Sequence, residues 1–417
     1  MHIIQKLIKS GNGYIHYNTS NRSFLDVMEQ LRNREIKNHY FMLALFDPTL
    51  AEIDPFREDL TKDQQIAVMI ECSRNPWYFF REILRIPNGK NIDKFTLDLS
   101  RSAILYCIVQ GYSVWKAGLR QSGDSTISSG IILWRYMFDR LDQIKTGSGI
   151  MSATINDAKN ILRRVKNMNG LLPSYLKMDD KVFFHMKHEK SYDDELGYCM
   201  NTSATGNYSR IGIFRKHIDA EKTKISISRM NSLYAFMYYD MAEFITTMPD
   251  IISSIENNPI LSTCPEPIEV KENRSFLSSL FKNKESDTVK EQDVYACDIG
   301  LFSDLLYNRI KSSVKLFCSV PNDLKHPEVK RLNEEVFPHM LKWLDYYYDI
   351  IPTPAFNKYI EDIKSKDPDF NNIMYIEYDY KDLGYSEAQI NQLRRMLSND
   401  IIFRREVLLE RFNSEEK

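Results

Sequence analysis

The sequence KAGLRQSGDST, residues 116–126, decides the fold that we expect for this chain. It follows an apolar segment at 112–115, expected to be a short buried strand, and precedes a helical pattern at 127–140. A strand, a glycine-containing turn and a helix together form a cradle for phosphate, because turn N–H groups and the positive end of the helix dipole attract anions. A hydroxyl group from Ser125 or Thr126 would then coordinate Mg²⁺.

Asp124 departs from the usual chemistry of such a loop. A phosphate loop carries lysine directly before the Ser/Thr, where it neutralises the β- and γ-phosphates. Replacing lysine by aspartate changes the local charge by two units, and each unit is worth about 4 kcal/mol at about 4 Å and an effective dielectric constant near 20. We therefore expect weak phosphate binding. Without the lysine, an ordinary strand-to-helix connection is about as good an interpretation of the glycine turn as a phosphate site.

The segments after the loop predict an α/β fold. Strand character at 148–153 is followed by a helical pattern at 154–168, so strands and helices alternate as in a parallel sheet with right-handed crossovers. The apolar run at 234–240 ends on Asp240, and an acid at the end of a buried strand is where phosphate-loop enzymes hold Mg²⁺. A second acid, which polarises the attacking water, normally follows at once. Met241 occupies that place here, and Glu243 is the nearest carboxylate beyond it.

Composition excludes several classes of protein. The 417 residues are 43% hydrophobic and 27% charged, which indicates a globular chain with a substantial core. The net charge of −2 gives no general basic footprint for nucleic acid. Six scattered cysteines without C-x-x-C spacing indicate reduced thiols in an intracellular protein. Since no apolar run is long enough to span a membrane, we expect a soluble protein.

Three regions are expected along the chain. Residues 1–65 form an N-terminal arm or subdomain, residues 66–300 the core, and residues 301–417 its C-terminal part. The polar segment at 266–292 is expected to be a mobile loop. Helical patterns lie at 303–316, 327–347 and 386–412, and a strand-like pattern lies at 373–378.

Other patterns are interpreted as structural. The aromatic cluster at 75–87 is better explained by core packing than by ligand stacking. Arg163, Arg164 and Lys166 along the helix expected at 154–168 are interpreted as a solvated face rather than a DNA contact. His185 and His188 have the spacing of metal ligands but lack a third ligand, which favours a surface pair.

Taken together, several motifs resemble the ATPase part of a tailed-phage large terminase, in the order in which that family has them. They cover the chain from about residue 40 to its end and lie at 75–87, 95–105, 120–126, 238–245, 262–263, 375–384 and 403–410. The resemblance implies a P-loop NTPase fold of the additional-strand type, with a central, mostly parallel sheet flanked by helices and a small helical subdomain.

The resemblance also implies roles for single residues. Arg120 matches the loop arginine that stabilises transition-state charge, and Ser262 and Thr263 match the coupling motif. Ser100, beside Arg101, lies about where the family keeps an adenine-reading glutamine. The candidate residues are therefore Arg120 and Glu243 for catalysis, Gly123, Asp124, Ser125, Thr126 and Arg101 for nucleotide binding, Ser125 and Asp240 for the metal, and Ser262 and Thr263 for coupling.

By the same resemblance, the chain would drive double-stranded DNA into a capsid in the infected host cytoplasm, as a homo-oligomeric ring on the phage portal. Its cofactors would be ATP and Mg²⁺ if it is active, and none otherwise. The first interpretation is a terminase-like domain impaired or inactive in ATP hydrolysis, because Asp124 and Met241 replace key groups. The family's nuclease domain is expected to be absent, since the chain stops about where it would begin.

Two alternatives remain open at this point. One is a working motor in which Lys116 or Arg120 replaces the missing cation and Glu243 the missing base. The other is a structural or regulatory subunit that binds the portal, DNA or an active terminase without using nucleotide; a separate nuclease is a further expected partner. Nucleotide binding distinguishes the two classes.

Overall fold

The structure is a computed structural model. It describes residues 9–10, 13–36, 39–109, 111–119, 122–138, 147–152, 154–187, 195–202, 208–215, 234–240, 314–319, 330–342, 362, 365–366, 371–397 and 399–411. The expected mobile loop at 266–292 lies outside these residues, as do both members of the coupling motif. No helix in the described part of the chain is long and apolar enough to cross a membrane.

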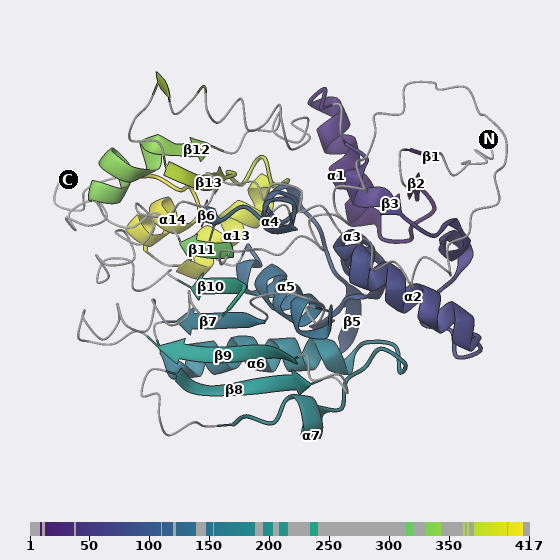
Figure 1. Ribbon diagram of the computed structural model, residues 1–417. Helices are drawn as coiled ribbons and strands as arrows, with labels where there is room; N and C mark the ends of the chain where they lie inside the picture. The colour runs from purple at the N-terminus through teal and green to yellow at the C-terminus, as the bar shows by residue number, and fades with distance from the viewer. Residues whose placement is uncertain are drawn as a thin grey trace.

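The centre of the molecule is an eight-stranded sheet (Figure 1). Its neighbouring strands pair in parallel except for β8 and β9, which are antiparallel. The predicted α/β class with a mostly parallel sheet is therefore confirmed. In spatial order the strands are β12 (Met340–Lys342), β13 (Asn371–Glu377), β6 (Val114–Ala117), β11 (Val314–Ser319), β10 (Phe236–Asp240), β7 (Ser148–Ser152), β9 (Tyr208–Arg215) and β8 (Glu195–Thr202).

The order of these strands is that of the additional-strand P-loop fold. Strand β6 leads into the glycine turn, β10 ends on Asp240, and β11 lies between them. Lys116 pairs in register with Cys318, and Cys318 pairs with Asp240, so the three residues form one row across three strands. Two strand spacings separate the backbones of Lys116 and Asp240 by about 10 Å. The turn and the acid thus lie at the same edge of the sheet, within the reach of one nucleotide.

Strand β11 corrects the sequence interpretation. The helical pattern predicted at 303–316 ends inside this strand, whose six residues, Val314–Ser319, are all buried. A strand buried on both faces shows no alternation of apolar and polar residues, so its pattern does not distinguish it from a buried helix. The helix predicted at 327–347 is likewise wrong at Met340–Lys342, which form strand β12.

Helices cover the sheet next to the glycine turn. Helix α4 (Leu99–Val109) precedes β6, α5 (Asp124–Phe138) follows the turn, and α6 (Ile155–Gly170) follows β7. Helix α5 packs against α4 and α6. Thr154 caps α6 by accepting a hydrogen bond from Asp157 N–H, and the helix predicted at 154–168 is confirmed. The strand predicted at 112–115 is shifted, since β6 includes the buried Lys116.

The two faces of the sheet have different cores. On one face, Val114, Leu316 and Tyr238 belong to a large hydrophobic cluster that also contains the buried side chains of α4, α5 and α6. On the other face, an aromatic row runs across the strands: Trp115 stacks on Phe317 at 5.2 Å between ring centroids, and Phe317 stacks on Tyr239 at 4.8 Å. Both faces exclude water, which explains the apolar strands.

The N-terminal residues join the large cluster. Helix α1 (Arg22–Asn33) and helix α2 (Lys62–Arg74) lie beside a small sheet of β1 (Lys9–Ser10), β2 (Gly13–Ile15) and β3 (Ala44–Leu45) (Figure 1). Thr61 and Gln64 form a capping box at the start of α2. The aromatic cluster at 75–87 is buried in the core: Trp77, Tyr78, Phe79 and Phe80 lie in α3 (Pro76–Tyr78) and η3 (Phe79–Ile83), which lead to the hairpin of β4 (Arg85–Asn88) and β5 (Asn91–Lys94).

A pair of short helices closes the C-terminal part. The segment predicted as one helix at 386–412 is broken into α13 (Glu387–Leu397) and α14 (Asp400–Glu406), because Asn399 caps a new helix by accepting from Ile402 N–H. Ile390, Phe403 and Val407 pack on Leu119 of the glycine turn in a separate small cluster.

Candidate nucleotide site

The glycine turn is fixed by backbone contacts at both ends. Gly118 N–H donates to the carbonyl of Ser319 at the end of β11 (3.1 Å). Gly123 has φ +85° and its carbonyl accepts from the N–H groups of Thr126 (2.9 Å) and Ile127 (3.0 Å), which begins helix α5. A positive φ favours glycine. A Cβ at Gly123 would also lie 2.2 Å from Nη2 of Arg101, so a side chain there would displace the guanidinium group of Arg101.

Lys116 lies underneath this turn and is 1% exposed. Its Nζ donates to both carboxylate oxygens of Asp124 (2.7 Å each) and to Oγ of Ser122 (2.6 Å). Ser122 Oγ in turn donates to Asp124 Oδ1 (3.0 Å). The three hydrogens of the ammonium group are therefore engaged, and the two charges cancel. Asp124 therefore pairs with the buried Lys116, and the motif of an ordinary phosphate loop does not predict this ion pair.

A second cation holds the turn from the other side. Arg101 on α4 donates from Nε and Nη2 to the carbonyl of Ser122 (3.2 and 2.8 Å) and from Nη1 to the carbonyl of Thr96 (2.7 Å). Its charge is matched by Asp98, whose Oδ2 lies 3.4 Å from Arg101 Nε. Burial raises the pKa of Asp98 above its usual value. Arg101 thus lies at the turn, and its hydrogen bonds there are with backbone carbonyls.

The two hydroxyl residues at the start of α5 have separate neighbours. Ser125 lies beside the hydroxyl of the buried Tyr238 on β10. Thr126 Oγ1 lies 2.7 Å from Nη1 of Arg164, an exposed arginine of α6. Arg164 is exposed, in agreement with the solvated face expected from the sequence, and it makes this contact at the surface.

The candidate metal ligands lie on neighbouring elements. Ser125 lies in the first turn of α5 and Asp240 ends β10, and both side chains are partly exposed. Hydroxyl and carboxylate oxygens suit Mg²⁺, which retains several water molecules when it binds to proteins. Among the described residues, no group of three or more His, Cys, Asp or Glu side chains could hold a metal ion by itself. The pair would therefore need phosphate oxygens to complete a magnesium site.

The described residues of the turn do not fit a triphosphate in this geometry. The buried cation is neutralised by Asp124, and Arg101 is matched by Asp98. Asp124 also occupies the first turn of α5, where its carboxylate offsets the positive end of the helix dipole. A phosphate group entering the turn would meet an acid whose counter-ion is already bound.

Several predicted site residues lie outside the described residues. These are Arg120, Glu243, Ser262 and Thr263, together with Met241 at the place of the missing base. The structure brings together the remaining candidates, which are Arg101, Gly123, Asp124, Ser125, Thr126 and Asp240. It adds Asp98, Ser122 and Arg164. A sequence signal existed only for Asp98, as the acid three residues before Arg101, a spacing that pairs charges on a helix.

Comparison with known proteins gives structural neighbours only. No protein-family model matches the chain, and no curated protein is similar to it in sequence. The large terminase ATPase domain of Thermus phage P74-26 is 14% identical, with a TM-score of 0.37; the match covers 76% of this chain and 94% of that one. The large terminase of another thermophilic bacteriophage, in complex with ADP, is 13% identical, with a TM-score of 0.37, and its ATP-gamma-S complex is 11% identical, with a TM-score of 0.36. Each of these two matches covers 75% of this chain, which spans about half of that terminase, 53% and 52%.

Proposed function

We propose that this chain is a terminase-like ATPase domain of a DNA-packaging machine that is impaired or inactive in ATP hydrolysis. The order of its terminase-like motifs supports the family, and the place of β11 between β6 and β10 supports the fold. Its proposed partners are the phage portal, double-stranded DNA and further copies of itself or an active terminase, in the host cytoplasm. Under this proposal the domain contributes binding surfaces to the packaging assembly and does not contribute ATP hydrolysis.

One observation carries the proposed loss of activity. Lys116 Nζ directs its three hydrogens to Asp124 and Ser122 inside the turn. Transferring this ammonium group to a phosphate would leave Asp124 unpaired beside that phosphate, and like charges at such distances cost several kcal/mol even after screening. The ion pair therefore competes directly with nucleotide. Weak binding follows from this competition rather than from a lack of positive charge near the turn.

Calorimetric titration with Mg-ATP tests the proposal. We expect the unmodified protein to bind no more tightly than about millimolar. Asp124→Asn retains the shape of the side chain but removes its charge, which makes Lys116 available to phosphate, so affinity should rise about tenfold or more. Asp63→Asn, in the first turn of the distant helix α2, is the matched control and should leave binding unchanged. Micromolar affinity in the unmodified protein, with steady hydrolysis, would overturn the proposal.

The contact between Arg164 and Thr126 favours a second candidate, a working motor with displaced groups. Arg164, an exposed arginine of α6, could turn from the hydroxyl of Thr126 at the start of α5 to a phosphate oxygen, since Arg binds phosphate well. In that case the unmodified protein hydrolyses ATP and Arg164→Gln lowers the rate. Arg163, whose side chain donates to Asn160 on the same helix, provides the control. Arg163→Gln should retain the rate of hydrolysis.

A further inference from the structure

The exposed residues of helix α6 are all of one chemical kind. Its exposed cations are Lys159, Arg163, Arg164 and Lys166, and the remaining exposed positions, 156, 160 and 167, are all asparagine. Every residue of α6 lies within the described part of the chain, and no acidic or apolar residue of this helix is exposed. Lysine and arginine donate hydrogen bonds and accept none, and asparagine adds two donors. The outward side of α6 is therefore a face of N–H donors, which we call the donor face.

The helix has one acid, and its N-terminal cap engages it. Thr154 Oγ1 donates to the carboxylate of Asp157 and accepts from the N–H of the same residue (3.2 Å). The exposed helices α1, α2 and α13 differ, because each exposes acidic residues beside its cations. The buried side of α6 packs against α5, β7 and β9 (Figure 1). The donor face is thus fixed by the fold, although the net charge of the whole chain is −2.

The protein itself holds the cations of the donor face weakly. Lys166 Nζ lies 3.7 Å from Asp180 Oδ2, and the two side chains are 45% and 39% exposed. An exposed pair of this kind contributes about 1 kcal/mol or less, so a phosphate can replace Asp180 at little cost. Arg163 donates to the neutral side chain of Asn160 (2.7 Å). Among the ion pairs of the described residues, none contains Lys159 or Arg163, so this positive charge is available to an anionic partner.

We propose that the donor face of α6 binds the phosphate backbone of double-stranded DNA. The inference rests on the proposed packaging role, which makes duplex DNA a partner, and it names the surface that meets this partner. Residues 156–167 extend over about 16 Å of helix, and duplex DNA carries one negative charge per about 1.7 Å of its axis. Several phosphates therefore lie along the face at once. Lys, Arg and Asn side chains bind phosphate oxygens without reading bases, as a machine that moves DNA of any sequence requires.

The fold also joins this surface to the glycine turn. Arg164, at the edge of the donor face, donates to Thr126 Oγ1 at the start of α5, and α5 packs along α6. From the sequence, the cations of α6 indicate a solvated face, because the pattern does not show that every exposed neighbour is also a donor. Complementarity to a polyanion is evident only in the folded helix, where the cap engages Asp157.

Fluorescence anisotropy with two labelled duplexes of unrelated sequence and equal length tests the donor face. We expect both duplexes to bind with the same affinity, which should fall steeply with salt. Lys159→Gln combined with Lys166→Gln should weaken binding about tenfold or more at low salt, and should reduce the slope of log affinity against log salt by about two. Lys62→Gln combined with Lys381→Gln removes the same charge from exposed positions on other elements and should change neither value.

A charge-retaining pair separates loss of the contact from loss of the fold. Lys159→Arg combined with Lys166→Arg keeps both cations and should keep the affinity and the salt slope. Both lysines are exposed, so all these variants should melt at the temperature of the unmodified protein. The Arg pair keeps the test decisive if glutamine at these positions lowers the melting temperature.

Four results would overturn the proposal. Unmodified protein that binds neither duplex overturns it and also removes DNA from the proposed partners. Binding that the two Gln pairs weaken equally, or that neither weakens, overturns the donor face alone and leaves the proposed function to the Mg-ATP titration. A preference for one duplex overturns backbone binding, because phosphates carry no sequence information. Displacement by polyglutamate that is as effective as displacement by unlabelled duplex of equal charge identifies an acidic protein segment as the partner instead.

Discussion

Lys116 shows how one residue can change the meaning of a motif. An ammonium group with 1% exposure requires a partner, because an isolated buried charge costs several kcal/mol. Asp124 provides that partner eight residues later, and Ser122 supplies the remaining acceptor. Asp124, which distinguishes this turn from an ordinary phosphate loop, is thus the group that stabilises the buried charge of Lys116.

This pairing predicts that a simple repair of the loop destabilises the protein. Asp124→Lys, which restores the usual phosphate-loop residue, removes the partner of Lys116 and places a second ammonium group beside it. We expect a loss of about 3 kcal/mol or more in the free energy of unfolding, measured by urea titration. Adding Lys116→Met should recover most of that loss, and only the double variant should gain Mg-ATP affinity. Full stability of the single variant would contradict the role of the pair.

Recovery of turnover needs a further change. The sequence predicts that Met241→Glu restores the group that orients water, and this stays a prediction because Met241 lies outside the described residues. Cation and carboxylate act in one transition state, so their effects should be far from additive. We expect hydrolysis only when Lys116→Met, Asp124→Lys and Met241→Glu are combined.

His16 predicts a pH dependence of stability. Its pKa of about 4 in the folded protein lies below the usual 6.5, so between these pH values the unfolded chain binds a proton that the folded chain does not. Stability should therefore fall by up to about 3 kcal/mol as pH decreases from 6.5 to 4. Glu71, whose pKa is raised by burial, acts in the opposite direction. Comparison with His16→Gln, which retains Glu71, isolates the histidine; parallel pH profiles of the two proteins would refute its contribution.

At the scale of elements, the C-terminal helices support the glycine turn from behind. Leu119 is 2% exposed and packs with Ile390 of α13, Phe403 of α14 and Val407, which directly follows α14. The turn and these helices are therefore one packing unit, although more than 250 positions separate them in the sequence. A change in the position of the helices would act directly on the turn.

Leu119→Ala tests this unit. Removing a buried leucine side chain costs about 2–5 kcal/mol, and here it should also loosen α13 and α14. Hydrogen exchange should rise in residues 387–406. Leu50→Ala is the matched control, because Leu50 is also 2% exposed but belongs to the large cluster. It should destabilise the protein without a selective rise in 387–406.

Elements with local signals were predictable, and those fixed by distant contacts were not. The cap at Thr154 follows from a few neighbouring residues, and its helix begins where predicted. Strand β11 has no local signal, because burial on both faces removes the alternation that marks a strand. In the candidate site, sequence reasoning proposed Arg101, Asp124 and Asp240, and their roles stay predictions. The Lys116–Asp124 pair and the Arg164–Thr126 contact depend on the turn and on the packing of α6, which the sequence pattern does not specify.

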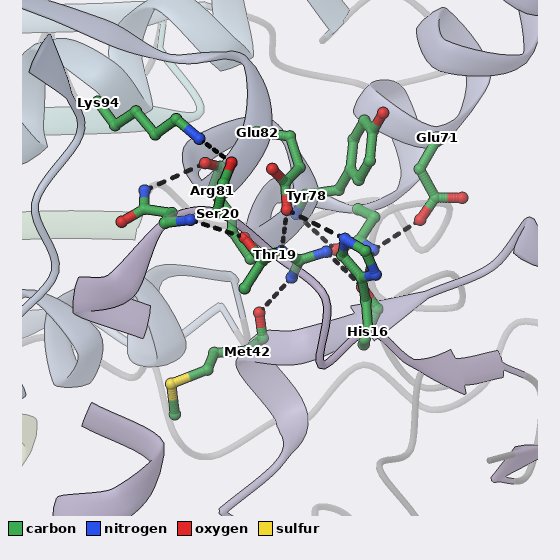
Figure 2. Close-up of polar contacts among 12 residues, drawn as sticks. His16, Thr19, Ser20, Met42, Glu71, Tyr78, Arg81, Glu82 and Lys94 are labelled. Atoms are coloured by element: carbon green, nitrogen blue, oxygen red, sulfur yellow. Dashed lines mark hydrogen bonds and ion pairs between the residues drawn. The ribbon is translucent and has the colours of Figure 1, made fainter. Parts of the chain in front are cut away.

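At the scale of the whole molecule, the N-terminal region and the sheet share one core. Ile15, Phe24 and Phe41 belong to the same hydrophobic cluster as Val114 and Ile376 in the sheet. Arg81, which is fully buried, ties the two parts further by donating to the carbonyls of Met42 and Ala44 (Figure 2). A boundary near residue 65 remains a prediction about the chain's organisation, but this core gives the two parts a common stability.

The shared core predicts a single unfolding transition. Trp77 reports on the N-terminal side, where its ring packs on Phe41 at 4.9 Å, and Trp115 reports on the sheet, stacked on Phe317. In variants that each retain only one of these tryptophans, the fluorescence transitions on heating should coincide, as a cooperative unit requires. Arg81→Met leaves the buried Glu82 without its cation, so the free energy of unfolding should fall by about 3 kcal/mol. Both transitions should therefore shift to lower temperature together. If the N-terminal region folded separately, Arg81→Met would lower only the transition reported by Trp77. The transition reported by Trp115 would then stay at its original temperature.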